Sequence, residues 1–494
     1  MKQFILILAT LFIAQCNQTS QQAIETNRKP DKPNFILILT DDTGWPGTSV
    51  QMDKNVPDSK HDYYHTPNIE RLAARGRRFS NGYAPAPVCS PTRYSIQYSQ
   101  TPARLNKWNV FQKTDHIDHE SMLALPQVLH KADSNYVVAH FGKWHIGCMP
   151  SQLGYDESDG MTTNREGHYN GNKEHIEYGT STDPKLIRSL THRSNDFMER
   201  MMEQGKPFYL QVSHYANHTK VECKPETYTK YKASPHPLII PEFAGMTENL
   251  DEGIGMLLDK VKELGIEDNT YIFLTADNGG VESFPPKRLE EGYNYPLEGG
   301  KWIVYEGGVR VPFIVAGPGV EENSQCDEPV TSMDLLPTIA SLVDYDLNAL
   351  PDYIEGNDIS PLILGTKEKI DREPGDFVFH YPRYVEWHMI DVKSAIRIGN
   401  YKLVKDWEKN TFELRERIPR SSAARVSEHN KNKQLIDDSS QLSCEESQLY
   451  DLKNDIGENN DLSGSMPDRV EQMDQMLVDY LVSVGQPVPP LIGL

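Results

Sequence analysis

A short apolar run followed at once by polar residues recurs along this chain, and it constrains the fold more than any other sequence feature. Residues 33–40 read PNFILILT and lead directly into Asp41 and Asp42. An uninterrupted apolar run of this length predicts a strand buried on both faces, which is typical of a parallel sheet. The same unit occurs three more times, at 135–142, 207–215 and 270–280.

Helical patterns lie between these runs. Segment 65–76 has Thr66 as a candidate N-cap, Pro67 in its first turn and Gly76 at its end. Strands that alternate with helices predict an α/β fold, with a large, mostly parallel sheet and helices on both faces. Ligand sites in such sheets lie at the carboxyl ends of the strands. Further helices are predicted at 185–203, 250–265 and 332–344.

The pattern changes near residue 376, where short strands separated by turns replace the alternating units. Gly399 and Asn400 mark a hairpin between two of them. The predicted elements are strands at 376–382, 394–407, 412–418 and 447–452, a charged loop at 418–443 and a helix at 467–485. The predicted parts of the chain are a signal segment at 1–16, a polar leader at 17–32, an α/β domain at 33–375 and a smaller antiparallel C-terminal subdomain at 376–494.

The N-terminus has the pattern of an export signal. Lys2 precedes an apolar run at 4–14, which is shorter than the roughly 20 residues that span a bilayer. Cys16 follows this run and is a candidate for a lipid anchor. We expect an exported protein that is periplasmic, anchored as an outer-membrane lipoprotein, or secreted.

The remaining cysteines match no zinc-binding spacing. Four further cysteines can form up to two disulfide bonds in an oxidising compartment, and the sequence leaves their pairing open. They are Cys148, Cys223, Cys326 and Cys444.

Paired oxygen donors follow two of the predicted strands. Asp41 and Asp42 follow the first strand, and Asp277 and Asn278 follow the strand near 270. Hard oxygen ligands of this kind suit Ca²⁺ or Mg²⁺. The alternative is that both segments are ordinary turn sequences.

Basic and histidine side chains also follow predicted strands or lie in nearby loops. The formal net charge of −21 argues against a general nucleic-acid binder, which needs a basic face. A local cluster of cations could still create an anion site in an acidic protein, although each residue alone could be a solvated loop residue. The candidates are Arg93, Lys143, His145, His218 and Lys301.

Cys89 lies in the stretch APVCSPTRYS and is predicted to begin a short helix, with Pro91 in the first turn. A helix start favours anions and lowers the pKa of a thiol, so a cysteine nucleophile is one interpretation. A soft thiolate beside a hard divalent cation is a poor match, however. An oxygen nucleophile would suit the site better.

These segments together resemble the type I, formylglycine-dependent sulfatases of the alkaline-phosphatase-like superfamily. Cys89-Ser90-Pro91-Thr92-Arg93 resembles the C-x-P-x-R signature of that family. The other similar segments follow in family order from about residue 33 to 462. They are LTDDTGW, FGKWHIG, TADNGG, GGKWIVYEGGVRVP and the C-terminal QLYDLKNDIGENNDL.

The resemblance implies that a formylglycine-generating maturation enzyme oxidises Cys89 to the aldehyde 3-oxoalanine, also called formylglycine. It also implies a bound Ca²⁺, with Mg²⁺ as a possible substitute. The implied metal ligands are Asp41, Asp42, Asp277, Asn278 and the modified Cys89.

The resemblance implies a role for each candidate cation. The hydrated aldehyde attacks the sulfur of a sulfate ester, and His218 or Lys301 donates a proton to the leaving alcohol. His145 then assists the second hydroxyl in expelling sulfate. Arg93 orients the diol, while Lys143 and Lys301 hold the sulfate oxygens as charge builds.

The expected substrate is an O-sulfate group on a polysaccharide or oligosaccharide. Alternatives are a phosphatase or phosphodiesterase of the same superfamily, or a non-catalytic lipoprotein that binds sulfated glycans. Several side chains are candidate sugar contacts, although the aromatic ones could equally be packing residues. They are Arg104, Trp108, His380, Tyr381, Arg383 and Trp387.

Overall fold

The central element is an eight-stranded sheet. The computed structural model describes residues 29–110, 112–167, 178–235, 239–282, 292–373, 375–382, 393–407, 446–486 and 488. The strand order is β11-β2-β10-β9-β1-β7-β4-β5. In that order the strands span Ser324–Cys326, Gly76–Phe79, Phe313–Ala316, Thr270–Ala276, Asn34–Thr40, Phe208–Ser213, Val137–Gly142 and Glu157–Ser158.

The middle of this sheet is parallel, as the sequence predicts. Strand β1 pairs in parallel with β7 on one side and with β9 on the other, and β4 pairs in parallel with β7. Strand β10 runs antiparallel to both β9 and β2. The large, mostly parallel sheet is therefore confirmed, with β10 as an antiparallel strand that the sequence analysis did not anticipate.

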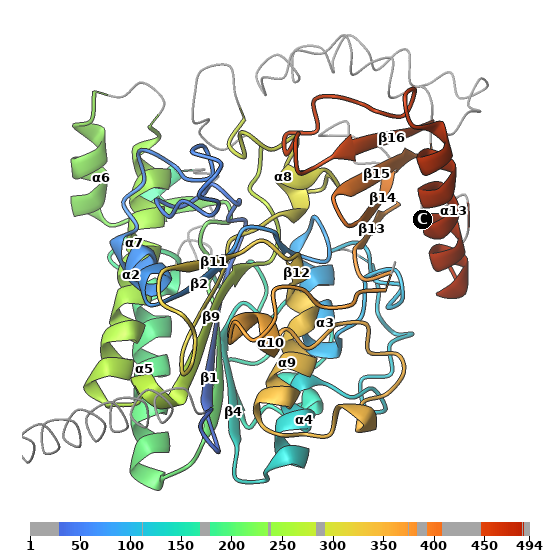
Figure 1. The fold of residues 1–494 in the computed structure, drawn as a ribbon. Helices are drawn as coiled ribbons and strands as arrows, with labels where there is room; N and C mark the ends of the chain where they lie inside the picture. The colour runs from blue at the N-terminus through green and yellow to red at the C-terminus, as the bar shows by residue number, and fades with distance from the viewer. Residues whose placement is uncertain are drawn as a thin grey trace, which may run out of the picture.

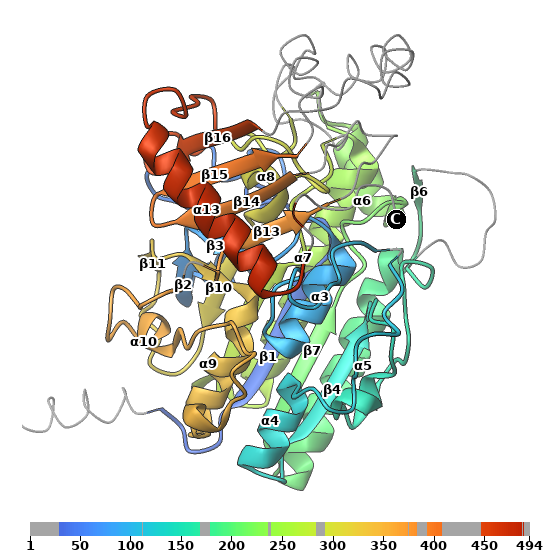
Figure 2. The ribbon, with the colours of Figure 1, turned by 90° about the vertical axis from the view of Figure 1, so that its right-hand side faces the viewer.

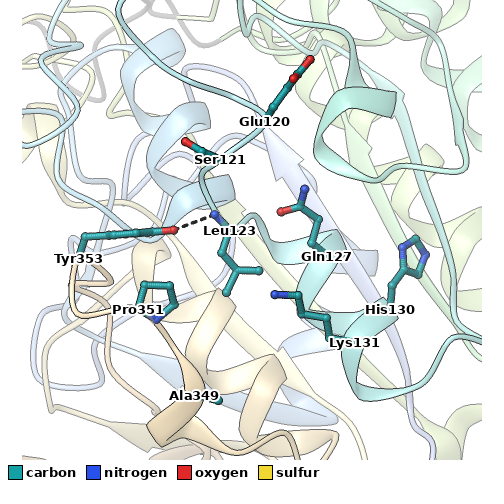
Figure 3. Close-up of a pocket in the computed structure, with 9 residues that line it drawn as sticks. All are labelled: Glu120, Ser121, Leu123, Gln127, His130, Lys131, Ala349, Pro351 and Tyr353. Carbon is teal, nitrogen blue, oxygen red and sulfur yellow. Dashed lines mark hydrogen bonds between the residues drawn. The ribbon is translucent and has the colours of Figure 1, made fainter.

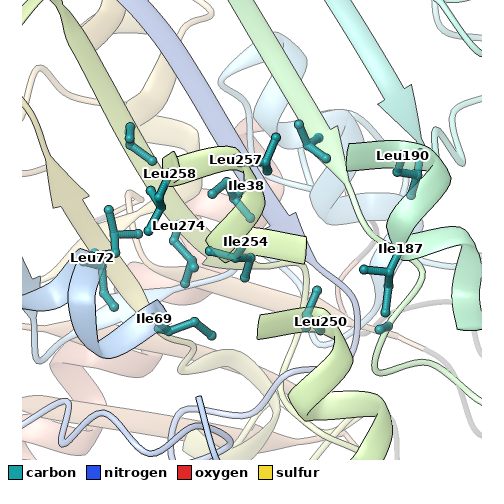
Figure 4. Close-up of a cluster of buried hydrophobic side chains, with 14 of the residues drawn as sticks. Ile38, Ile69, Leu72, Ile187, Leu190, Leu250, Ile254, Leu257, Leu258 and Leu274 are labelled. Atoms are coloured by element: carbon teal, nitrogen blue, oxygen red, sulfur yellow. The ribbon is translucent and has the colours of Figure 1, made fainter. Parts of the chain in front are cut away.

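Helices cover both faces of the sheet (Figure 1). Alternate residues of β1 face opposite layers, with Ile36 and Ile38 in one apolar cluster and Phe35 and Leu37 in the other. Figure 4 shows the first cluster, where side chains from three helices pack onto the sheet. These helices are α2 (Pro67–Ala74), α5 (Ile187–Gln204) and α7 (Pro241–Glu263). The opposite layer contains α3 (Cys89–Tyr98), α4 (Leu125–Ala132) and α9 (Leu335–Leu342).

The predicted helices all occur, with differences at their ends. Helix α7 begins at Pro241, about two turns before the predicted start, because Pro241 occupies its first turn and the apolar positions continue from Phe243. Thr66 does not cap α2 with its side chain. Its hydroxyl instead accepts a hydrogen bond from the backbone N–H of Ser49, at 2.9 Å.

A separate antiparallel sheet lies above the carboxyl-end side of the main sheet, and α13 packs across it (Figure 2). The predicted hairpin turns at Gly399, which has a positive φ of 59°. The elements are β13 (Val378–Tyr381), β14 (Lys393–Ile398), β15 (Tyr401–Asp406), β16 (Glu446–Asp451) and α13 (Pro467–Ser483). The strand predicted at 412–418 and the loop predicted at 418–443 lie outside the described residues.

Short elements complete the fold. Two small parallel pairs join β3 (Gly82–Tyr83) to β12 (Val330–Thr331) and β6 (Tyr178–Thr180) to β8 (Val221–Cys223). The short α-helices are α6 (Pro225–Lys232), α8 (Glu306–Val309) and α10 (Ser360–Ile363). Single 3₁₀ turns lie at Pro150–Leu153, Pro184–Leu186, Glu267–Asn269, Ser332–Asp334 and Leu347–Ala349.

The described residues also test two expectations about cysteines and membrane spans. Cys148, Cys223 and Cys326 are buried free thiols, so they form no disulfide bond with one another. Cys16 and Cys444 lie outside the described residues. Within the described ranges, every helix is too short or too polar to cross a bilayer.

Candidate active site

The two pairs of oxygen donors meet because β1 and β9 are neighbours in register. Thr40 lies opposite Ala276, so the residues after each strand emerge side by side. The backbone N–H of Asp42 donates to Oδ1 of Asp277 at 3.2 Å. Nδ2 of Asn278 donates to Oδ1 of Asp42 at 2.8 Å. The residues that follow these two strand ends are therefore in direct contact with one another.

Each carboxylate of this cluster pairs with a cation from a distant segment. Lys143, just after β4, places its Nζ 2.5 Å from Oδ2 of Asp41. Lys301 places its Nζ 2.6 Å and 2.8 Å from the two carboxylate oxygens of Asp42. All of these side chains are almost completely buried, so the charges interact strongly.

Arg93 pairs with the third carboxylate of the cluster, that of Asp277. Its Nε and Nη2 lie 2.9 Å and 2.7 Å from Oδ2 of Asp277. Its Nη1 donates to the backbone carbonyl of Lys143. Arg93 therefore ties the helix that begins at Cys89 to both the acidic cluster and the lysine loop.

Two buried oxygen atoms of the cluster have no hydrogen-bond partner among the described residues. They are Oδ1 of Asp41 and Oδ1 of Asn278. Buried oxygens are normally satisfied, so an unpartnered pair indicates a missing ligand. The three cations already balance the three carboxylates, and a divalent ion would make the cluster net positive. A hard cation such as Ca²⁺ or Mg²⁺ fits this donor set, and a positive cluster suits an anionic substrate.

Cys89 begins α3, as predicted, and its Sγ lies 3.4 Å from Nδ1 of His145. Oγ of Ser90 holds the loop that carries His145 beside Cys89, because it donates to the carbonyl of His145 at 3.0 Å. Burial, followed by the charges of Lys143 and Arg93, holds the pKa of His145 well below its usual value. The imidazole is therefore neutral, with one ring nitrogen unprotonated.

The expectation that the helix start lowers the thiol pKa of Cys89 is wrong. Burial raises the pKa of this thiol, and the opposing charges of Lys143 and Lys301 do not overcome that effect. The unmodified cysteine is thus a neutral thiol at neutral pH and a weak nucleophile.

His218 lies at the other side of the cluster, in the loop after β7. Its Nε2 is 3.9 Å from Oδ2 of Asp42. Asp41, Asp42 and His218 bring one ligand atom each to within 4.8 Å of one another. Burial and then the charge of Lys301 hold the pKa of His218 well below its usual value, so it is neutral here.

The site therefore brings together every metal and catalytic residue that the sequence analysis singled out.

The candidate sugar contacts have other surroundings. Arg104 is paired with Glu355 at 2.8 Å, and Trp108 is half-buried. His380 and Tyr381 are buried in β13, where His380 shares a hydrogen bond with Ser394. These two side chains expose almost no surface for a sugar. Arg383 and Trp387 lie outside the described residues.

The sequence analysis overlooked Lys107. This buried ammonium donates to three backbone carbonyls, of Asn109 at 2.5 Å, Val110 at 3.3 Å and Gln112 at 2.9 Å. Burial lowers its pKa to about 8, although the nearby Cys89 opposes the change. No motif or periodicity marks Lys107, and only its closeness in sequence to Cys89 could have drawn attention to it.

A cavity of about 540 Å³ lies elsewhere, between α4 and the loop at 349–353 (Figure 3). None of its lining residues belongs to the acidic cluster or its cations. His130, one of them, pairs with Asp156 at 3.1 Å. The catalytic candidates therefore lie outside this cavity.

Comparison with known proteins gives the family. The sulfatase family model matches residues 33–345, and a model described as the C-terminal part of N-sulphoglucosamine sulphohydrolase matches residues 300–441.

Individual proteins are similar over most of the chain. Arylsulfatase A of Homo sapiens is 26% identical over 90% of this chain and 86% of its own length. The ulvan-active sulfatase of Formosa agariphila is 27% identical over 71% of this chain and 69% of its own length. The solved structure of BT4656 with its substrate D-glucosamine-2-N,6-O-disulfate has a TM-score of 0.62 at 17% identity, over 92% of this chain and 97% of that one.

The strand-end acidic cluster, its three cations and the buried Cys89 thus lie within the segment that matches the sulfatase model. The chain belongs to the sulfatase family of the alkaline-phosphatase-like superfamily and is a sulfuric ester hydrolase.

Proposed function

We propose that this enzyme hydrolyses O-sulfate groups on a polysaccharide or oligosaccharide, using a formylglycine at position 89 and a divalent cation. The observation that carries the proposal is the position of Cys89. Its sulfur lies beside the neutral imidazole of His145, at the start of a helix that Arg93 ties to the acidic cluster. A nucleophile at this position would have a base and several cations around it.

Asp41, Asp42, Asp277, Asn278 and the modified residue 89 would hold the cation. Ca²⁺ is the first candidate, and Mg²⁺ is the second. When bound, such an ion polarises oxygen atoms and stabilises negative charge. The unpartnered oxygens of Asp41 and Asn278 support this assignment.

The chain's own side chains have distinct roles in this proposal. Arg93 orients the diol of residue 89, and Lys143 and Lys301 bind sulfate oxygens. His145, neutral and in contact with position 89, accepts a proton from the diol as sulfate leaves. Lys301 rather than His218 donates a proton to the leaving alcohol, because the imidazole of His218 is neutral. Lys301 is protonated at neutral pH: burial would lower its pKa, but Asp42 and the other negative groups around it together raise it.

A sulfated glycan is the substrate class best supported by the relatives. An ulvan-active sulfatase and a structure with a sulfated glucosamine are among the similar proteins. An export signal ending near Cys16 would place the enzyme in the periplasm, on the outer membrane or outside the cell, where such polymers occur. Cys89 would require a formylglycine-generating enzyme as a maturation partner.

The phosphatase and glycan-binding alternatives receive no specific support. The described residues contain a single cluster of three or more metal-ligating acidic, histidine or cysteine side chains, and it is the one above. A two-metal phosphatase site would need a second set.

The test combines mass spectrometry with sulfate release. The peptide that contains position 89 is expected to show an aldehyde in place of the thiol in active protein. Cys89→Ala should abolish sulfate release from sulfated oligosaccharides, whereas Cys326→Ala, which removes another buried thiol, should retain it. An unmodified thiol in fully active protein, or full activity in Cys89→Ala, would refute the proposed mechanism.

A further inference from the structure

A buried network of charges joins the C-terminal sheet to the short helix α8. Glu306, the first residue of α8, receives Nζ of Lys402 at 2.9 Å and Nε of Arg310 at 2.6 Å. The hydroxyl of Tyr83 donates to the same carboxylate at 2.7 Å. Glu458 accepts the backbone N–H of Glu306 at 2.7 Å and lies 3.0 Å from Lys402. Lys402 is on β15 and Glu458 follows β16, so the C-terminal subdomain supplies both groups.

Helix α8 in turn packs against the loop that carries Lys301. The backbone of Gly307 donates to the carbonyl of Glu298 at 2.8 Å. A Cβ atom on Gly308 would lie 1.8 Å from the carbonyl oxygen of Ile303 and 2.4 Å from that of Gly300. Such close backbone contact leaves no room for the loop and the helix to move independently.

The same helix also touches the segment after β9 that follows Asp277 and Asn278. The N–H of Gly279 donates to the carbonyl of Gly308 at 2.9 Å. The N–H of Lys301 donates to the carbonyl of Gly280 at 3.0 Å. The position of Lys301 relative to Asn278 therefore depends on where α8 lies.

We infer that Lys402 and Glu458 are positioning residues for the catalytic reaction, because they fix Glu306 and through it the loop of Lys301. The inference rests on the function proposed above, in which Lys301 contacts the sulfate ester. Neither residue touches the site itself. Their effect on catalysis passes through α8 and its glycine contacts.

Because Lys402 is buried, its charge has to be paired, and the network depends on that pairing. Its side chain is fully buried, and so are both carboxylates it contacts within a few per cent. An unpaired buried charge is strongly destabilising, so the network holds α8 in one arrangement as long as all members are present. Removing the ammonium leaves Glu306 with Arg310 as its counter-charge and leaves Glu458, whose pKa burial raises to about 8, without its cation. The helix must then shift or one acid must take up a proton.

Lys402→Met tests the inference, with Lys405→Met as the matched control. Lys405 lies on the same strand and is also buried, but it pairs with Asp474 of α13 at 2.8 Å and so links a different part of the subdomain. Both variants remove a buried lysine from an ion pair, although Asp474 is 27% exposed and the partners of Lys402 are buried. Thermal unfolding and the aldehyde content at position 89 give the folded, matured fraction, and kcat is expressed per such site.

We expect kcat per folded site on a sulfated oligosaccharide to fall at least about tenfold in Lys402→Met, since a displacement of about 1 Å can cost about 100-fold. Lys405→Met should stay within about twofold of the wild type, because it leaves the Lys301 loop in place. Equal kcat per folded site in the two lysine variants would overturn the inference. Wild-type protein that carries the aldehyde but releases no sulfate would instead overturn the proposed function.

Substitutions at Glu458 give a second, independent readout. Glu458→Gln keeps a carbonyl oxygen that can accept the N–H of Glu306, whereas Glu458→Met removes that acceptor. Glu458→Gln should therefore retain most of kcat, and Glu458→Met should lose it to a similar degree as Lys402→Met. Equal kcat per folded site in both Glu458 variants would also overturn the inference.

Discussion

Gly279→Ala probes how tightly the segment after β9, which carries Asp277 and Asn278, is held against α8. Gly279 directly follows Asp277 and Asn278, the oxygen donors at the end of β9. A Cβ atom at Gly279 would lie 1.8 Å from the carbonyl oxygen of Gly307 and 3.0 Å from Cα of Gly308. Both neighbours are backbone atoms, so no side-chain rotation can relieve the clash.

The size of the effect follows from these distances. Real contacts of this kind essentially never fall below 3.0 Å, so the two backbones must separate by roughly 1.2 Å. Overpacking of this kind costs about 1–3 kcal/mol in the free energy of unfolding. A domain typically has about 5–15 kcal/mol, so most of the protein should remain folded. A displacement of about 1 Å between reacting groups, in contrast, can lower the rate about 100-fold.

The assay compares kcat/KM for sulfate release with the thermal unfolding midpoint. Gly279→Ala should lower kcat/KM by about 100-fold while the unfolding midpoint falls by only a few degrees. Gly464→Ala is the control, because no atom lies within 4 Å of a Cβ placed there. Wild-type kcat/KM in Gly279→Ala would refute the claim that these two backbones must stay in contact for catalysis.

Three further predictions concern the core, the pH dependence of stability and the metal. Leu274→Ala, in the buried cluster of Figure 4, should lower the free energy of unfolding by about 2–5 kcal/mol in urea titrations, whereas Val482→Ala on the exposed face of α13 should change it little. Burial raises the pKa of Asp376 to about 7, despite the opposing charge of Arg372. The folded state then binds a proton more tightly than the unfolded state, so this carboxyl's contribution to stability is full below about pH 4 and is lost as the pH rises to about 7. Asp376→Asn should therefore gain stability relative to the wild type across that range, and a pH-independent difference would contradict the assignment. Dialysis against a chelator should abolish sulfate release and lower the unfolding midpoint, and Ca²⁺ should restore both; activity that survives complete chelation would exclude the metal site.

The sequence predicted the parallel centre of the fold well, because long apolar runs and helical patterns are local signals. Strands β1, β4, β7 and β9 all begin within two residues of the predicted starts. The antiparallel strand β10 escaped prediction. It has only four residues, and its direction depends on its partners in the sheet rather than on its own pattern.

The sequence indicated which residues lie together in the site, but not which cation pairs with which carboxylate. The strand-end rule brought Asp41 and Asp277 together from sequence alone. The sequence could not tell which lysine meets which carboxylate, because the partners are more than 100 residues apart and loop geometry decides the match. The thiol pKa of Cys89 was mispredicted for a related reason. Its value depends on burial by distant segments, and no local pattern reports that burial.

These cross-segment pairings also determine how cation substitutions should be interpreted. Lys143 and Asp41 are both fully buried, and Lys143 is the ammonium that pairs with Oδ2 of Asp41. Removing Lys143 alone therefore does two things: it removes the proposed contact to the sulfate, and it leaves a buried carboxylate without its counter-charge. A large loss of activity in Lys143→Met would mix both effects. A double-mutant cycle with Asp41→Asn, measured on the free energy of unfolding of metal-free protein, isolates the ion pair, because Asp41 is also a proposed metal ligand and its substitution would lower activity by itself. The same reasoning applies to Lys301 with Asp42, so each cation in this site has to be tested together with its acid.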